Sequence, residues 1–416
     1  GIENWTPEHK GSDSIYGEVI KTNRWELSSR YELPSSQNIV WQSSYNYHNQ
    51  DSYYGDSEYK GTQNTLFNQL LWYKDLGLRH RLTTGIAYKF NSFNDNTPAT
   101  KEIDLTYIPG FFIQDEFALS DKWKFLSGIR WDKHQDHGNI FAPRLNLKWT
   151  PNANTSFRWN TGTGFRVVNI FTEDHAALTG ARDIVITNEL QPEESISINF
   201  NLHHWFQRKN HHTSIDLDLF YTHFSNKIVP NYNTDPTKII YDNLEGYSIS
   251  KGASFQINQS FSIPLNISLG GTYLDVYTIN EAEKNIELFT PSFSGVFSIG
   301  YEWPLNKIKL DYTGRIMGPM YLPTYEEEFA RDEISPWYTL QHLKVEKRFT
   351  SKIIAYLGVR NLFNFTQESP LVDPGAGSNA ATNESWQAGF SPNFDTAYVY
   401  GPTRGRRYII GLSWKL

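Results

Sequence analysis

The chain has 416 residues, a formal net charge of −7 and no cysteine. Without cysteine it forms neither disulfide bonds nor thiolate metal sites, and its acidic balance argues against nucleic acid as a partner. Mean hydropathy is −0.54, and no stretch approaches the roughly 18 consecutive apolar residues of a membrane-spanning helix. These properties exclude a spanning helix, but they do not exclude a protein that crosses a membrane with strands.

In chain order, segments of about ten residues with two-residue alternation succeed one another, beginning with a strand from about Ile15 to Leu33. Each segment places apolar side chains on one face and polar or charged side chains on the other. The clearest apolar faces are Trp123, Phe125, Ile129 and Trp131; Ile215, Leu217, Leu219 and Tyr221; Ile308, Leu310, Tyr312 and Ile316; and Tyr408, Ile410, Leu412, Trp414 and Leu416. A strand that meets lipid on one side and water on the other needs this period.

The connectors alternate between short and long along the chain. The short ones are 33–37, 74–77, 119–122, 150–154, 206–211, 260–264, 303–306 and 349–352. The long ones are 48–61, 91–106, 134–141, 163–193, 226–247, 278–290, 317–336 and 363–404. Outer-membrane barrels have short periplasmic turns and long extracellular loops, whereas a soluble sandwich gives its turns no reason to sort by length. We therefore predict an all-β, antiparallel transmembrane β-barrel with about seventeen strands in this chain.

The start of the chain also carries information. Single-chain bacterial barrels have an even number of strands, so about seventeen strands do not complete one. The alternation places the first strand so that it runs inward from the cell surface. We therefore predict that residues 1–14 are a remnant of an extracellular loop and that 15–416 form the C-terminal portion of the barrel. The missing strands are then expected elsewhere in the full protein, because a bilayer does not tolerate open sheet edges.

Five segments in the same order resemble the barrel of TonB-dependent outer-membrane receptors. They are FFIQDE at 111–116 with LSDK at 119–122 and GIRWD at 128–132, GTGFR at 162–166, LQPEES at 190–195, VRNLFN at 359–364, and the closing strand at 408–416. The resemblance implies a 22-stranded, plugged barrel, so about five strands, the plug domain and the TonB-binding segment lie outside this chain. One departure is Leu416 at the end, where the family usually has an aromatic residue.

The resemblance also implies a function. Such a receptor binds a scarce nutrient of the metal chelate, siderophore, haem or cobalamin class at its extracellular loops, in the outer membrane of a Gram-negative bacterium. Import uses energy from the TonB-ExbB-ExbD complex through the missing N-terminal segment. Outer-membrane lipid surrounds the barrel, and a surface lipoprotein is a further possible partner. The alternative is a passive porin-like or adhesive barrel without energy coupling. No nucleophile and base constellation stands out, so we expect neither enzymatic activity nor a cofactor.

Aromatic and charged residues in the long connectors are the candidate ligand-binding residues. They are Arg166, His175, Arg182, Tyr232, Tyr321, Tyr325, Trp386 and Phe390. We favour the 163–193 connector, because Arg166, His175 and Arg182 can oppose an anionic chelate there. The alternative is that these side chains pack loops against one another.

The two methionines of the chain, Met317 and Met320, are the candidate metal ligands. They lie together at the head of the 317–336 connector, and thioethers are soft ligands for Cu(I). The alternative is that they anchor the loop, because methionine readily fills irregular apolar gaps.

Overall fold

The computed structural model describes residues 6–12, 17–34, 37–97, 100, 102–167, 183–186, 188, 190–231, 238–280, 283–325, 329–370, 372 and 398–414. After a short 3₁₀ helix, Pro7–His9, the strands are β1 Glu18–Glu32, β2 Ile39–Tyr54, β3 Ser57–Leu76, β4 His80–Asp95, β5 Asp104–Ala118, β6 Trp123–His134, β7 Gly138–Asn152, β8 Thr155–Arg166, β9 Asp183–Ile186, β10 Glu193–Arg208, β11 His211–Ser225, β12 Ile228–Asn231, β13 Lys238–Asn243, β14 Gly246–Phe261, β15 Leu265–Asn280, β16 Glu283–Ile286, β17 Phe293–Trp303, β18 Ile308–Met317, β19 Tyr338–Arg348, β20 Ile353–Arg360 and β21 Arg407–Trp414. None of the helices in these ranges has the length and apolar character needed to cross a membrane.

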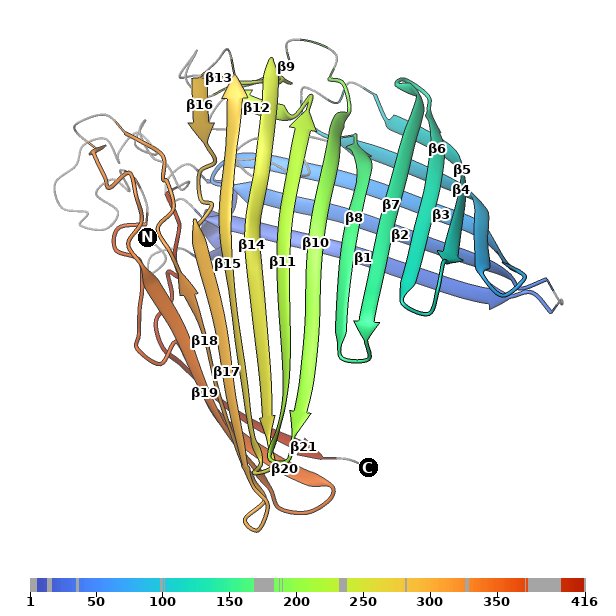
Figure 1. The fold of residues 1–416 in the computed structure, drawn as a ribbon. Helices are drawn as coiled ribbons and strands as arrows, with labels where there is room; N and C mark the ends of the chain where they lie inside the picture. The colour runs from blue at the N-terminus through green and yellow to red at the C-terminus, as the bar shows by residue number, and fades with distance from the viewer. Residues whose placement is uncertain are drawn as a thin grey trace.

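One sheet of eighteen strands contains all of these except β9, β12 and β13. Strands that follow one another in the sheet pair antiparallel, and β8 pairs directly with β10. Apart from the four-residue β16, seventeen long strands remain, which confirms the predicted number. Figure 1 shows them curving from the blue strands near β1 through the green and yellow strands to the orange strands β17 to β19.

The described sheet has two unpaired edges. Among the described strands, β1 pairs only with β2, and β21 pairs only with β20. Their apolar side chains are open to the surroundings, with Trp25 on β1 72% exposed and Ile410 on β21 83% exposed. A bilayer does not tolerate unpaired backbone groups in hydrocarbon. We therefore still predict that further strands complete the barrel.

The outer face of the sheet carries apolar side chains in continuous cross-strand rows. Leu310 lies directly opposite Tyr301 on one side and Val345 on the other. Leu357 and Ile410 continue the same row across β20 and β21. Leu357 is 53% exposed, although nothing in water favours an exposed apolar row of this length. Contact with lipid explains it, as the alternation predicts.

The inner face is polar, and several of its charged groups have polar or charged partners. Arg158 Nη1 donates to Asn201 Oδ1 at 3.0 Å, and Asn201 Nδ2 donates to Asp218 Oδ1 at 2.8 Å. Lys124 Nζ lies 3.2 Å from Glu116 Oε1. Such pairing is expected in a wet lumen, where carboxylates and cations can neutralise one another without leaving water.

Aromatic side chains form a belt on the outer face, at the end of the sheet with the short connectors. Centroid distances between neighbouring rings are 5.4 Å for Trp123 and Trp149, 5.0 Å for Trp149 and Phe157, and 5.3 Å for Trp159 and Phe200. Rings with an apolar body and a polar tip suit the membrane interface. The belt therefore marks one membrane interface, at the end of the sheet where the short periplasmic turns are predicted.

Two of the predicted long loops are wrong, because the strands continue through them. In the 48–61 connector, β2 and β3 remain paired up to a turn at Gly55, whose φ is +62°. In the 134–141 connector, β6 and β7 are joined by the turn 135–137, and Gly138 directly after it has φ +71°. Beyond the membrane both faces of a hairpin meet water, so the apolar alternation disappears while the hydrogen-bonded ladder persists. Other long connectors contain the short strands β9, β12, β13 and β16.

The assigned faces can be tested with Leu310→Arg. A charge near the bilayer midplane costs roughly 2–4 kcal/mol, so we expect a reduced yield of folded, heat-resistant barrel on gels. The matched control is Thr313→Arg, which lies on the same strand but faces inward, and should be mild. Equal losses for the two variants would contradict the assigned faces.

Candidate ligand-binding site

A hollow of about 520 Å³ lies on the inner side of the sheet, at the extracellular ends of β8, β10, β11, β14 and β15. Charged, hydroxyl and aromatic side chains line it. The lining residues are Gly164, Phe165, Arg166, Glu193, Glu194, Ser195, Phe224, Lys227, Ser248, Ser250, Val276 and Glu287. Arg166 is the last residue of β8 and Glu193 the first of β10. The long connector between them therefore leaves and re-enters the sheet at this hollow.

The carboxylate of Glu193 organises the hollow and is only 6% exposed. Its Oε2 accepts a hydrogen bond from Arg166 Nε at 2.8 Å and lies 2.7 Å from Arg166 Nη2. Its Oε1 accepts the backbone N–H of Ile228 at 3.0 Å. A buried carboxylate requires such partners, because an unpaired charge away from water is costly. The Arg166 side chain stays 56% exposed, so its planar guanidinium is accessible from the solvent side.

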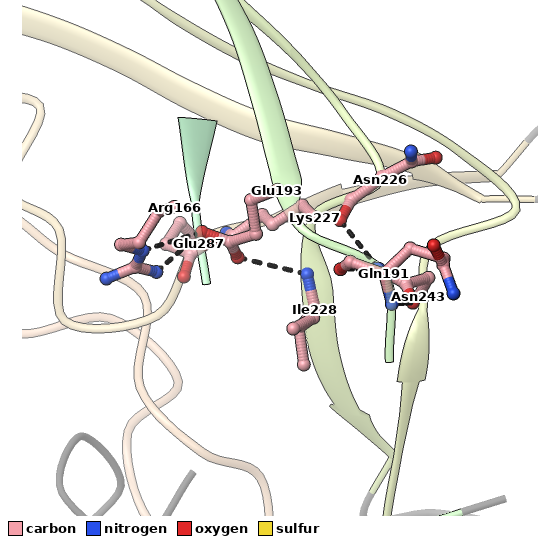
Figure 2. A network of polar contacts seen from close by, with 8 residues as sticks. All are labelled: Arg166, Gln191, Glu193, Asn226, Lys227, Ile228, Asn243 and Glu287. Carbon is pink, nitrogen blue, oxygen red and sulfur yellow. Dashed lines mark hydrogen bonds and ion pairs between the residues drawn. The ribbon is translucent and has the colours of Figure 1, made fainter. Parts of the chain in front are cut away.

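A second ion pair lines the same hollow. Lys227 Nζ lies 2.9 Å from Glu287 Oε2, with 24% of the lysine side chain and 42% of the glutamate side chain exposed. Figure 2 shows Glu287 close to Arg166 and Glu193, with Lys227 reaching in from the segment after β11. Two cations and two carboxylates from four segments of the chain therefore meet in one place.

Asn243 fixes the segments that carry these charges. Its Nδ2 donates to the carbonyl oxygens of Gln191 at 3.0 Å and Asn226 at 2.8 Å, and its Oδ1 accepts the N–H of Gln191 at 2.7 Å. Asn226 directly precedes Lys227, and Gln191 lies shortly before Glu193 (Figure 2). Asn243 is also the last residue of β13, so the small sheet of β12, β13 and β9 is attached to the same segments.

The loops after β18 and β20 share a separate apolar core. It consists of Met320, Leu322, Tyr338, Leu340, Val372 and Tyr398. The ring of Tyr338 stacks on Phe365 with a centroid distance of 4.9 Å, and its hydroxyl donates to the Tyr400 carbonyl at 3.0 Å. Burial raises the pKa of the Tyr398 hydroxyl, which stays neutral and donates to the Asp332 carbonyl at 2.7 Å. The two loops thus fold as one body, which we call the loop core.

Of the predicted site residues, Arg166 lies in the hollow. Tyr321 forms an isolated β-bridge with Ile334 and is 43% exposed. The ring of Tyr325 lies 6.0 Å from that of Tyr398, and Tyr325 packs against the loop core. The predicted residues His175, Arg182, Tyr232, Trp386 and Phe390 lie outside the described residues.

The two methionines have a packing role in the structure. Met320 is 3% exposed within the loop core, and Met317 packs against that core. The alternative of an apolar loop anchor is therefore favoured over a thioether ligand presented to solvent. In the part of the chain that the structure describes, no group of three or more His, Asp or Glu residues could hold a metal ion.

The sequence reasoning missed Glu193, Lys227 and Glu287 as site residues. The segment LQPEES was recognised as the start of a strand, but its first glutamate could have been singled out as the partner of the arginine that ends β8. No local signal marks the other pair, because Lys227 and Glu287 are 60 residues apart.

Comparison with known proteins assigns the chain to a family. The family model described as TonB dependent receptor-like, beta-barrel matches residues 4–362. The chain therefore belongs to this family, and its sheet is the wall of an outer-membrane β-barrel. Such family members are receptors and transporters, which agrees with the expectation that the chain is not an enzyme.

Individual relatives narrow the comparison. The chain is 26% identical over 311 residues to the iron-regulated outer membrane virulence protein of Vibrio cholerae serotype O1, covering 68% of this chain and 45% of that protein. It thus spans about half the length of the curated relatives it matches.

Solved structures share the fold at low identity. The siderophore receptor PirA from Pseudomonas aeruginosa aligns with a TM-score of 0.66 at 15% identity, covering 96% of this chain and 65% of that one. The FrpB iron transporter from Neisseria meningitidis gives a TM-score of 0.69 at 11% identity, covering 95% and 63%. The copper transporter OprC gives 0.67 at 14% identity, covering 95% and 65%.

The role of Glu193 can be tested with Glu193→Ala. Removing the carboxylate deprives the Ile228 N–H of its acceptor, and a hydrogen bond to a charged group contributes about 1.5–3 kcal/mol. We expect hydrogen exchange at Ile228 to become about 10- to 100-fold faster, while the barrel stays folded. The matched control is Glu245→Gln, an exposed carboxylate at the β13–β14 turn, which should leave this exchange unchanged. Unchanged exchange in Glu193→Ala would show that β12 is held by other contacts.

Proposed function

We propose that the receptor containing this chain imports an anionic, oxygen-rich iron chelate of the siderophore class and binds it at the hollow around Arg166. The observation that carries this proposal is the placement of an accessible guanidinium in a hollow of about 520 Å³ at the extracellular end of the lumen wall. Ligand sites in proteins commonly have volumes of 300–1,000 Å³. Arginine is suited to anionic oxygens because its fork of N–H groups binds them bidentately.

The ion pairs around the hollow allow an anionic ligand to share the cations with their carboxylate partners. Arg166 is paired with Glu193, and Lys227 is paired with Glu287. These ion pairs keep both cations in position before a ligand binds. An anionic chelate can share Arg166 with Glu193, because a guanidinium has five N–H donors. Serine hydroxyls from Ser195, Ser248 and Ser250 can supply further hydrogen bonds to the chelate.

The names of similar proteins favour iron among the nutrients that the sequence leaves open. The curated relatives are called iron-regulated, and two of the aligned structures are a siderophore receptor and an iron transporter. None of the three is named for haem or cobalamin. The copper transporter OprC is also similar in fold, but Met320 is buried and does not present its thioether to solvent, and Met317 packs against the loop core.

Energy coupling forms part of the proposal. The outer membrane holds no ion gradient, so work on the bound chelate must come from a periplasmic partner, which we propose is the TonB-ExbB-ExbD complex. The polar inner face, with its paired charges, suits contact with a plug domain that fills the lumen. The barrel would then supply the wall and the extracellular part of the binding surface.

The binding site can be tested with the double variant Arg166→Gln and Lys227→Gln in the full-length receptor. Loss of two cations should weaken binding of ferric catecholate, hydroxamate or carboxylate chelates at least 10-fold, since hydrogen bonds between charged groups contribute about 1.5–3 kcal/mol each. Intrinsic tryptophan fluorescence of the purified receptor measures the affinity. The control variant, Arg208→Gln and Lys209→Gln, changes the same residue types at the β10–β11 turn on the periplasmic side. Equal affinities in both variants for every chelate that binds would move the site away from the hollow.

Coupling can be tested separately with the unaltered receptor. Cells that lack TonB should bind the ferric chelate at their surface with unchanged affinity but accumulate none of its iron. Uptake of labelled iron, compared with surface binding at low temperature, separates the two steps. Uptake at the same rate with and without TonB would support the passive barrel instead.

A further inference from the structure

Charged and aromatic side chains also gather on the outer face, at the extracellular ends of β11, β14, β15 and β16. Lys251 lies directly opposite Tyr221 on one side and Asp275 on the other. Strand alternation places Tyr277 on the same face as Asp275, and Lys284 lies beside it on β16, opposite Ile279. We call these five residues the rim patch. It belongs to the lipid side of the wall, whereas the hollow around Arg166 lies on the lumen side.

The rim patch has more positive than negative groups. Lys251 Nζ lies 3.3 Å from Asp275 Oδ2 and 5.4 Å from the ring centroid of Tyr277. Lys284 Nζ lies 4.3 Å from the same ring centroid. Within the described residues no carboxylate is within ion-pair distance of Lys284. Both ammonium groups therefore lie near the ring of Tyr277, and of the two only Lys251 is paired with a carboxylate. Cation–π contact does not neutralise the charge of Lys284.

The position of the patch relative to the lipid is set by strand register. The next row toward the membrane centre contains Leu219 and Tyr273, which are 45% and 58% exposed. Phe255, one row further down, is 44% exposed. Successive rows on one face are about 7 Å apart, because residues in a strand are spaced by about 3.3 Å. The ammonium groups thus stand directly above the apolar belt, at the level of lipid head groups, where lysine side chains commonly reach.

We propose that the rim patch binds the phosphate groups of a phosphorylated glycolipid of the outer leaflet, with the acyl chains lying along Leu219, Tyr273 and Phe255. The ammonium groups match phosphate in charge, and each basic residue near a membrane surface attracts anionic lipid. The apolar row directly below matches the acyl chains. This inference rests on the outer-membrane position of the wall and not on the proposed import of a chelate.

The test uses the full-length receptor in detergent with lipid A carrying two phosphate groups as the probe. The variant Lys251→Gln and Lys284→Gln should bind this lipid about 10- to 30-fold more weakly, from roughly 1 kcal/mol per basic residue. Native mass spectrometry of receptor titrated with the lipid measures the bound fraction. The charge-preserving variant Lys251→Arg and Lys284→Arg should retain binding, which separates charge from folding. Affinity for ferric chelates should be unchanged in both variants.

Two comparisons make the outcome decisive. The control variant Lys74→Gln and Lys347→Gln removes two lysines at the periplasmic ends of β3 and β19 and should bind the lipid as the unaltered receptor does. Lipid A without phosphates should bind the unaltered receptor as weakly as intact lipid A binds the Lys251→Gln and Lys284→Gln variant. Binding of intact lipid A that is the same with and without Lys251 and Lys284 would overturn the proposal. So would equal binding of the lipid with and without phosphates.

Discussion

The structure depends on one constraint, which is that backbone N–H and C=O groups cannot remain unpaired in hydrocarbon. A sheet satisfies this constraint because each strand forms its backbone hydrogen bonds with the next strand. The seventeen long strands here pair in this way in sequence order. The ladder then fixes which side chains face lipid and which face the lumen. The row from Tyr301 through Leu310 to Ile410 and the polar row through Asn201 are both consequences of that one ladder.

The same ladder positions the candidate site without requiring the site itself to be regular. Arg166 ends one strand and Glu193 begins its neighbour, so the ion pair forms where the paired segment stops. The side chain of Glu193 is not part of the ladder, and its Oε1 accepts the N–H of Ile228, where β12 begins. Charges that would be costly in the bilayer are tolerated at this height, because the lumen mouth is open to water.

The features that depend on the two-residue alternation could be predicted from the sequence. The number of long strands, the faces of Leu310 and Ile410 and the short periplasmic turns all follow from it. The period failed in the 48–61 connector, because a hairpin that stands in water needs no apolar face although its strands remain paired. Of the residues that line the hollow, only Arg166 was among the predicted site residues. Its partners come from distant segments, and the pair of Lys227 with Glu287 depends on a register that a single sequence does not reveal.

The loop core limits how the sequences of its two loops can change in evolution. Tyr338, where the loop after β18 enters β19, contacts Phe365 and Tyr400 of the loop after β20, so the two loops pack against each other. Tyr398 adds to this, because its hydroxyl in the loop after β20 donates to the carbonyl of Asp332 in the loop after β18. A substitution in one loop therefore changes the fit of the other, and the two must evolve as a pair. An engineer who wishes to graft a new surface onto this barrel would have to exchange both loops together.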